Sequence, residues 1–135
     1  MKTKYKYSGV VPFWFKDGTL QVLLVKTKSK KKWITPKGKI EENMTPQESA
    51  LKEAEEEGGI KGEIIGEKLG YYNLERGKRG KENRILLFPM KVTEELIDYK
   101  EKNIRERRWC SMDEVLILLS NDDLKKLIQS IEILY

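Results

Sequence analysis

The chain has no histidine and only one cysteine, Cys110, among its 135 residues. A single cysteine cannot form an intrachain disulfide, and the common zinc sites need several histidine or cysteine ligands. The Ser-His and Cys-His pairs that activate nucleophiles in many enzymes are excluded as well. Carboxylate chemistry remains, together with metals that prefer oxygen ligands.

Long apolar runs are also missing. The first residues, MKTKYKYSGVVPFWF, contain too short an apolar stretch for a secretory signal or a membrane span. We therefore expect a cytoplasmic protein that has no membrane partner. The length fits one domain of ordinary size, so residues 1–135 are expected to form a single domain.

Basic residues are abundant, and they are concentrated in three segments. Residues 26–39 hold seven lysines and no acidic residue, although the net charge of the whole chain is only +5. Residues 76–84 hold five basic residues against one acidic residue, and residues 102–108 hold four basic residues. This concentration of charge predicts a polyanionic partner.

The pattern of apolar and turn residues predicts an α+β fold. The expected strands are Tyr5–Phe15, Leu20–Lys26, Trp33–Thr35, Gly62–Asn73, Asn83–Thr93 and Ile104–Ser111. An Asp17-Gly18 turn should join the first two strands in a hairpin, and the basic stretch Leu74–Glu82 should form an exposed loop. Helices are expected from Ser111 to Leu119 and from Asn121 to about Leu134.

The most informative segment is PKGKIEENMTPQESALKEAEEEGGI at residues 36–60. A loop with Gly38 precedes a helix that should begin at the N-cap Thr45 and end near Glu57. Three glutamates at i, i+3 and i+4, namely Glu53, Glu56 and Glu57, share an arc of roughly a quarter turn on that helix. Like charges so close together repel unless a cation gathers them, so the spacing predicts a divalent metal site.

This segment resembles the Nudix box, whose pattern is Gly-x5-Glu-x7-Arg-Glu-apolar-x-Glu-Glu-x-Gly-apolar. Seven of its nine defined positions agree here: Gly38, Glu53, Ala54, Glu56, Glu57, Gly59 and Ile60. The resemblance implies a Nudix-type α/β/α sandwich with a mixed β-sheet. It also implies hydrolysis of a diphosphate bond with Mg²⁺ or Mn²⁺.

The resemblance assigns roles to individual residues. Glu53 and Glu57 would be the main metal ligands, and the carbonyl of Gly38 would be a further ligand. Glu56 would be a ligand or the general base, so that Glu56 and Glu53 are the candidate catalytic residues. Which glutamate accepts the proton stays open, because members of the family differ.

Two box positions depart from the pattern. Met44 stands where the family has glutamate, and Lys52 stands where it has arginine. In the family these two positions often act together, the basic residue orienting the catalytic carboxylates. Lys52 keeps the positive charge but lacks the bidentate fork of arginine. We expect weaker or altered metal use rather than loss of catalysis.

Beyond the box, the chain is similar to the diphosphoinositol polyphosphate phosphatase branch of the family, which also cleaves long dinucleoside polyphosphates. By that similarity the residues facing substrate phosphates would be Lys26, Lys28, Lys37, Lys39, Lys81, Arg84 and Arg105. The expected partner is therefore a polyphosphorylated small molecule, bound by a monomer or weak dimer.

Two alternatives stay open. Met44 is compatible with a catalytically silent Nudix-like module that binds a polyphosphate ligand. The basic segments could also serve RNA 5′-end pyrophosphate hydrolysis, since phosphate contacts need only lysine and arginine. No recognition helix or RNA-stacking motif accompanies the basic segments, so we do not expect nucleic acid as the partner.

Overall fold

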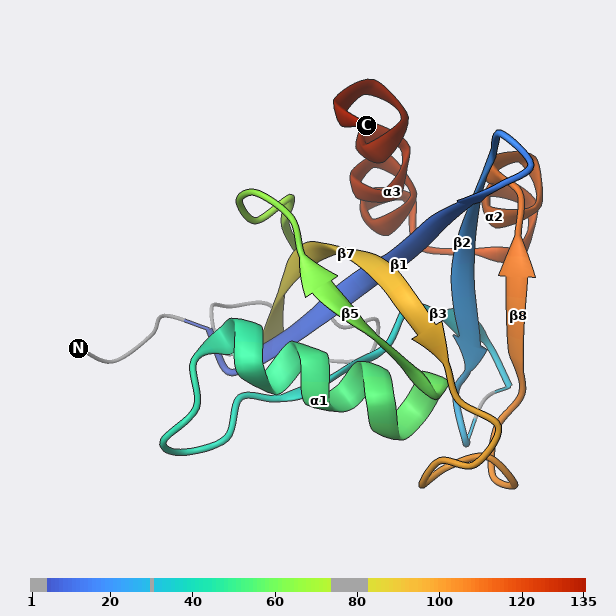
Figure 1. The fold of residues 1–135 in the computed structure, drawn as a ribbon. Helices are drawn as coiled ribbons and strands as arrows, with labels where there is room; N and C mark the ends of the chain where they lie inside the picture. Colours follow the sequence, from blue (N-terminus) through green and yellow to red (C-terminus); the bar gives the residue numbers. More distant parts are fainter. Residues whose placement is uncertain (1–4, 30, 74–82) are drawn as a thin grey trace.

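The computed structural model describes residues 5–29, 31–73 and 83–135 (Figure 1). The predicted loop Leu74–Glu82, with Lys81, lies outside the described residues. In chain order the elements are β1 (Tyr7–Lys16), β2 (Thr19–Lys26), β3 (Trp33–Ile34), β4 (Lys37–Lys39), α1 (Pro46–Gly58), β5 (Ile60–Ile64), β6 (Gly70–Asn73), β7 (Arg84–Glu95), β8 (Arg107–Cys110), α2 (Met112–Leu118) and α3 (Asp122–Leu134).

The strands form a mixed sheet, which confirms the prediction. Its main path runs β3-β2-β1-β7-β5, while β4 pairs with β1, β6 with β7 and β8 with β2. The neighbours β1 and β7 are parallel, with Gly9 opposite Leu87 and Pro12 opposite Met90. The other pairings between strands are antiparallel.

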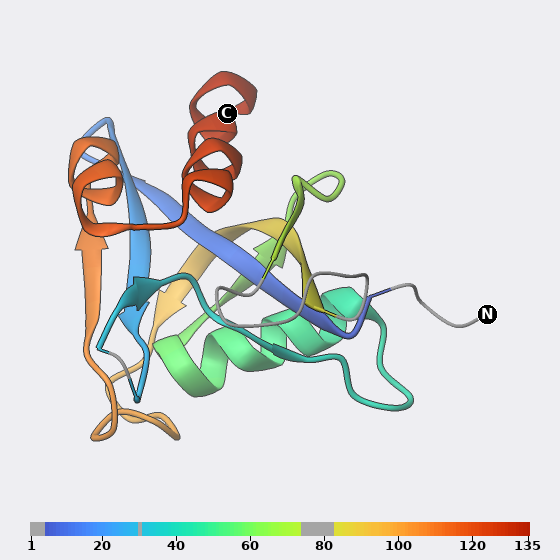
Figure 2. The same cartoon turned by 180° about the vertical axis from the view of Figure 1, so that it is seen from behind.

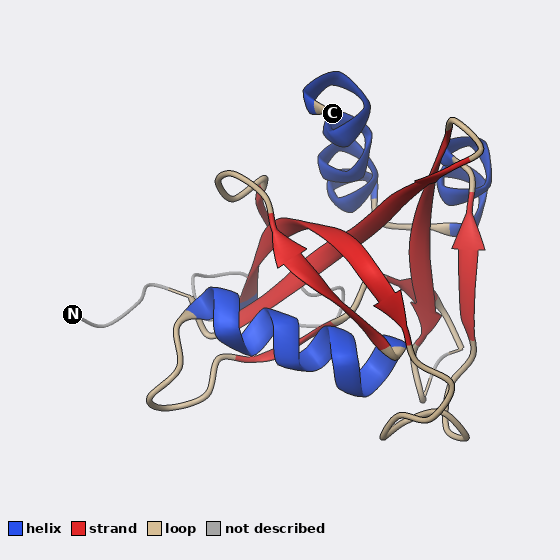
Figure 3. Ribbon diagram, in the orientation of Figure 1, coloured by secondary structure: helices blue, strands red, loops and turns tan. Residues whose placement is uncertain are grey.

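Helices cover both faces of the sheet, as Figures 1 and 2 show from opposite sides. Alternate residues of one strand point to opposite faces, so β1 contributes Val10 to the core against α1 and Val11 to the core against α2 and α3. The α1 side contains Ala50 and Ala54, both fully buried. The predicted α/β/α sandwich is therefore confirmed, and α1 lies alone on its face (Figure 3).

Local sequence signals account for the element ends. Asp17 and Gly18 both have positive φ, at 53° and 78°, and join β1 to β2 in the predicted hairpin. Capping boxes at Thr45 and Ser111, the predicted helix starts, open α1 and α2, and Asn121 caps α3. At Gly59 the backbone is left-handed, with φ at 63°, and α1 ends there.

Three expectations about strands are wrong in detail. The predicted strand Gly62–Asn73 is two strands, β5 and β6, because the chain turns between Ile65 and Leu69. Strand β8 begins only at Arg107, since residues before it form turns. Residues 37–39 were expected in a loop, but they pair with Tyr7–Gly9 as β4. Backbone pairing with a distant strand made this segment extended, despite its glycine and two lysines.

Among the described residues, no helix is long and apolar enough to cross a membrane.

Candidate functional site

The candidate site lies at the C-terminal half of α1. Hydrogen bonds from Arg107 hold this end of the helix in place. The Arg107 guanidinium donates to the carbonyl oxygens of Gly58 and Gly59, at 2.9 and 3.2 Å, and to that of Leu96 at 2.8 Å. A cation at the C-terminus of a helix also suits the helix dipole. The last turn of α1 is thereby tied to β8 and to the loop that follows β7.

Glu53 and Glu57 meet on the inner side of α1, one turn apart. The Glu57 side chain is buried, and its Oε1 accepts a hydrogen bond from the backbone N–H of Lys37 at 3.2 Å. A Cβ atom added at Gly38 would lie 2.4 Å from the carboxyl carbon of Glu53. A side chain at residue 38 would therefore force the Glu53 carboxylate to move, and glycine lets β4 lie against it.

Burial changes the acidity of this pair. It raises the pKa of Glu57 to about 8, although the Arg105 charge acts in the opposite direction. Burial also raises the pKa of Glu53. The two carboxyl groups lie next to each other, so each affects the pKa of the other. Metal binding to a carboxyl group whose pKa is raised competes with its proton.

A fourth carboxylate, Glu101, lies beside the pair, and the sequence analysis missed it. Its Oε1 forms an ion pair at 2.8 Å with Nε of Arg105, whose Nη1 lies 3.8 Å from Oε1 of Glu57. Lys28 approaches the other oxygen of Glu101 at 3.7 Å, and the Glu101 N–H donates to the carbonyl of Glu56 at 3.0 Å. The available signal was an i, i+4 acid–base pair between Glu101 and Arg105, which is too common to identify a site.

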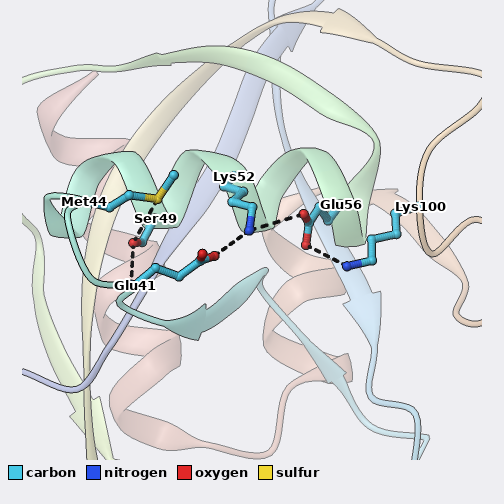
Figure 4. Close-up of polar contacts among 6 residues, drawn as sticks. All are labelled: Glu41, Met44, Ser49, Lys52, Glu56 and Lys100. Atoms are coloured by element: carbon cyan, nitrogen blue, oxygen red, sulfur yellow. Dashed lines mark hydrogen bonds and ion pairs between the residues drawn. The ribbon is translucent and has the colours of Figure 1, made fainter.

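Glu56 points elsewhere, although it shares the helical arc with Glu53 and Glu57. Its carboxylate is paired with Lys52 and with Lys100, each at 3.6 Å (Figure 4). The structure therefore brings Glu53 and Glu57 together and holds Glu56 next to two lysines. Within the described parts of the chain, no three acidic or cysteine side chains converge closely enough to hold an ion by themselves.

The donors nevertheless fit a hard divalent cation. Glu53 and Glu57 supply oxygen atoms at one point, and the absent side chain of Gly38 leaves the backbone of β4 against them. Mg²⁺ usually takes only one or two carboxylates and keeps several waters, so a complete protein cage is not required. Glu101 adds a further negative charge close to Glu53.

Two of the predicted phosphate-binding residues, Lys26 and Arg105, line a surface pocket of about 190 Å³. Its cationic lining residues are Lys26, Lys31, Lys102 and Arg105. Lys26 pairs with Glu106 at 3.3 Å, and the Arg105 side chain is only 9% exposed. Because Arg105 also contacts Glu57, this pocket borders the carboxylate pair.

The remaining predicted phosphate ligands are spread along the sheet. Lys37 and Lys39 lie on β4, and Lys37 is the residue whose N–H binds Glu57. Arg84 begins β7, and its guanidinium lies over the Tyr71 ring at 4.3 Å. Tyr7 of β1 pairs with Lys39 on one side and with Ile85, next to Arg84, on the other. The contact of these residues with substrate stays a prediction.

Comparison with known proteins gives one consistent result. The model of the NUDIX domain family matches residues 7–131. Nudix hydrolase 12, a mitochondrial protein of Arabidopsis thaliana, is 37% identical over 105 residues, which are 73% of this chain and 52% of that protein. Diphosphoinositol polyphosphate phosphohydrolase 3-alpha of Mus musculus is 30% identical over 102 residues, 73% of this chain and 60% of that protein.

A solved structure shows the same fold. The Ap4A hydrolase of C. elegans superposes with a TM-score of 0.74 at 18% identity, covering 95% of this chain and 96% of that one. The chain spans little more than half the length of the two curated relatives named above.

Proposed function

The chain belongs to the Nudix family, and we propose that it is a hydrolase that uses Mg²⁺ or Mn²⁺ to cleave a diphosphate bond in a highly phosphorylated small molecule. The observation that carries this proposal is the pair of buried Glu57 and half-buried Glu53, set against Gly38 and next to a basic pocket. Two adjacent carboxylates at the edge of a cationic pocket can supply metal ligands next to donors for phosphate.

The proposed metal ligands are Glu53, Glu57 and the carbonyl of Gly38. When bound, the metal would offset charge on the bridging phosphates and make water easier to deprotonate. The chain's own contribution is to hold the two carboxylates in place. The Lys37 N–H fixes one oxygen of Glu57, and the Arg105 charge partly offsets the cost of burying it. The metal could be either ion, since both favour oxygen ligands.

Glu56 is the proposed general base. Its side chain is 23% exposed, so it is open to solvent beside the buried pair, and Lys52 and Lys100 restrict its orientation. A base must reach the proton it accepts, and an exposed carboxylate adjacent to the metal ligands satisfies this better than a buried, hydrogen-bonded one. Glu53 is the second candidate, in the same role.

The proposed substrates are dinucleoside polyphosphates and diphosphoinositol polyphosphates. The pocket lined by Lys26 and Arg105 provides cationic donors next to the carboxylate pair, and charge-assisted bonds to phosphate reward such a cluster. The name of the mouse relative supports the inositol compounds. Lys28, Lys37, Lys39 and Arg84 are proposed to bind further phosphates, as is Lys81 outside the described residues.

The competing proposal is a silent module that binds a polyphosphate without cleaving it, and the altered box positions Met44 and Lys52 favour it. The test is a screen of nucleoside, dinucleoside and diphosphoinositol polyphosphates and of 5′-triphosphate RNA. Turnover is measured with Mg²⁺, with Mn²⁺ and with a chelator, and binding is measured in parallel by calorimetry. We expect metal-dependent phosphate release from a compound with five or more phosphates. Tight binding without turnover at every metal concentration would refute the enzyme and support the silent module.

We propose that residues 1–135 form one domain and act in the cytoplasm. The mitochondrial location in the name of the plant relative belongs to that protein. The proposed oligomeric state is a monomer or weak dimer. Measurement of the molar mass in solution by light scattering would test it.

A further inference from the structure

The loop before α1 makes a turn that brings Glu41 close to Lys52. The Met44 N–H donates to the carbonyl of Glu41 at 3.2 Å, and Asn43 has a left-handed backbone with φ at 67°. Asparagine tolerates this conformation better than most residues. The Ser49 hydroxyl, which is buried, accepts the Glu41 N–H at 3.0 Å. The backbone at Glu41 is thus attached to α1.

Glu41 begins a row of alternating charges on the outer side of α1 (Figure 4). Nζ of Lys52 lies 2.5 Å from Oε2 of Glu41 and 3.6 Å from Oε2 of Glu56. Lys100 contacts the other oxygen of Glu56 at 3.6 Å. Lys52 therefore bridges two carboxylates, with the shorter contact to Glu41.

Met44 cannot take part in this row. A thioether is only a weak acceptor, and Met44 Sδ lies 3.6 Å from the Ser49 hydroxyl, which donates to it. The box position at residue 44 therefore carries no charge in this chain. Three residues earlier, Glu41 supplies a carboxylate to Lys52 at hydrogen-bond distance.

We propose that Glu41 is a positioning residue that takes over the role of the missing box glutamate at residue 44. Glu41 holds the Lys52 ammonium at the point where it also contacts Glu56, and so restricts the orientation of the Glu56 carboxylate. The catalytic part of this proposal rests on the proposed function of Glu56.

The physical reason lies in the flexibility of lysine. A lysine loses considerable rotamer freedom when it is held, and a single exposed i, i+4 pair with Glu56 is weak. A second carboxylate at short range reduces the number of positions open to Nζ. Because the Glu41 backbone is fixed by Ser49 and by the turn at Met44, it contributes this restraint without a long flexible loop.

The experiment compares Glu41→Gln, Lys52→Met and the double variant, with Glu42→Gln as the control. Glu42 is the exposed neighbour of Glu41 in the same turn, so its replacement removes the same charge. The readouts are kcat and KM with Mg²⁺, urea unfolding of the metal-free protein, and the NMR signal of the Lys52 ammonium, which is visible when a strong hydrogen bond slows its exchange with water.

We expect Glu41→Gln to lower kcat by about two- to fivefold, the size of one exposed pair, while KM and the unfolding midpoint change little. The Lys52 signal should disappear in Glu41→Gln and persist in Glu42→Gln. The double variant should be no slower than Lys52→Met alone, because Glu41 acts only through Lys52.

Two results would overturn the proposal: equal losses in Glu41→Gln and Glu42→Gln, or additive losses in the double variant. Either would mean that total charge matters and the position of Lys52 does not. If the wild-type protein turns over no substrate, the proposed function fails by itself. The NMR comparison then still decides the contact, since a Lys52 signal that survives Glu41→Gln would show that Glu41 does not position this lysine.

Discussion

The two sides of α1 carry ion pairs of different character. On the inner side, Arg105 lies between Glu101 and Glu57, and the Arg105 and Glu57 side chains are each 9% exposed. On the outer side, Lys52 lies between Glu41 and Glu56, and the Lys52 side chain is 39% exposed. Removal from water makes the inner charges costly to leave unpaired, whereas water screens the outer ones. Acid–base pairs on the two sides of one helix therefore differ in what they cost to break.

The largest effect is expected from Glu57→Gln, on the inner side. Loss of one outer-shell partner of a metal already costs 10- to 100-fold in activity or affinity, so loss of a ligand should lower turnover by more than about 100-fold. The fold should persist, because an uncharged amide replaces a carboxyl group whose pKa is raised to about 8. Steady-state turnover and circular dichroism check this. Glu55→Gln, on the exposed side of the same turn, is the control, and unchanged turnover in Glu57→Gln would show that the metal site is misplaced.

Arg105→Met tests the inner ion pairs through stability. Removing the cation takes away the 2.8 Å partner of the Glu101 carboxylate, which is 11% exposed, so unfolding in urea should require about 3–5 kcal/mol less free energy. The matched control is Arg108→Met, which breaks an exposed pair with Glu114 and should cost less than about 1 kcal/mol. Similar losses in the two variants would mean that burial does not distinguish the two kinds of pair.

The pH dependence of metal binding tests the raised pKa of Glu57. The pKa of Glu57 is about 8 in the folded protein and 4.5 in the unfolded chain, so the folded state binds more protons between these values. Without metal, stability should fall as pH rises through this window. Apparent metal affinity should rise by about tenfold per pH unit, because binding displaces one proton. Calorimetry in two buffers of different ionisation enthalpy would count that proton, and a count of zero at neutral pH would contradict the raised pKa of Glu57.

Met44→Glu should have the smallest effect, on the outer side. Glu41 already provides a carboxylate to Lys52, so a second one should leave turnover unchanged or raise it by no more than about threefold. A carboxylate at the start of α1 also suits the helix dipole. Initial rates at several Mg²⁺ concentrations check this. A large loss would instead show that the contact between Met44 and the Ser49 hydroxyl is required.

Local signals determined much of the fold. The Asp17-Gly18 turn, the capping boxes at Thr45 and Ser111, and the glycine that ends α1 act within a few residues, and each lies where it was predicted. Strand β4 could not be predicted in this way. Its residues favour a loop, and only pairing with Tyr7–Gly9 makes them extended.

By itself the sequence determined the family, the mixed α+β architecture and the carboxylates of α1, because spacing along one helix depends on helix geometry alone. The tertiary structure decided which of those carboxylates meet. It brought Glu53 and Glu57 together against Gly38, held Glu56 between two lysines, and brought Glu101 and Arg105 to them from a distant loop. Burial and the approach of distant charges set the acidity of these groups, and both depend on packing between segments that lie far apart in the chain.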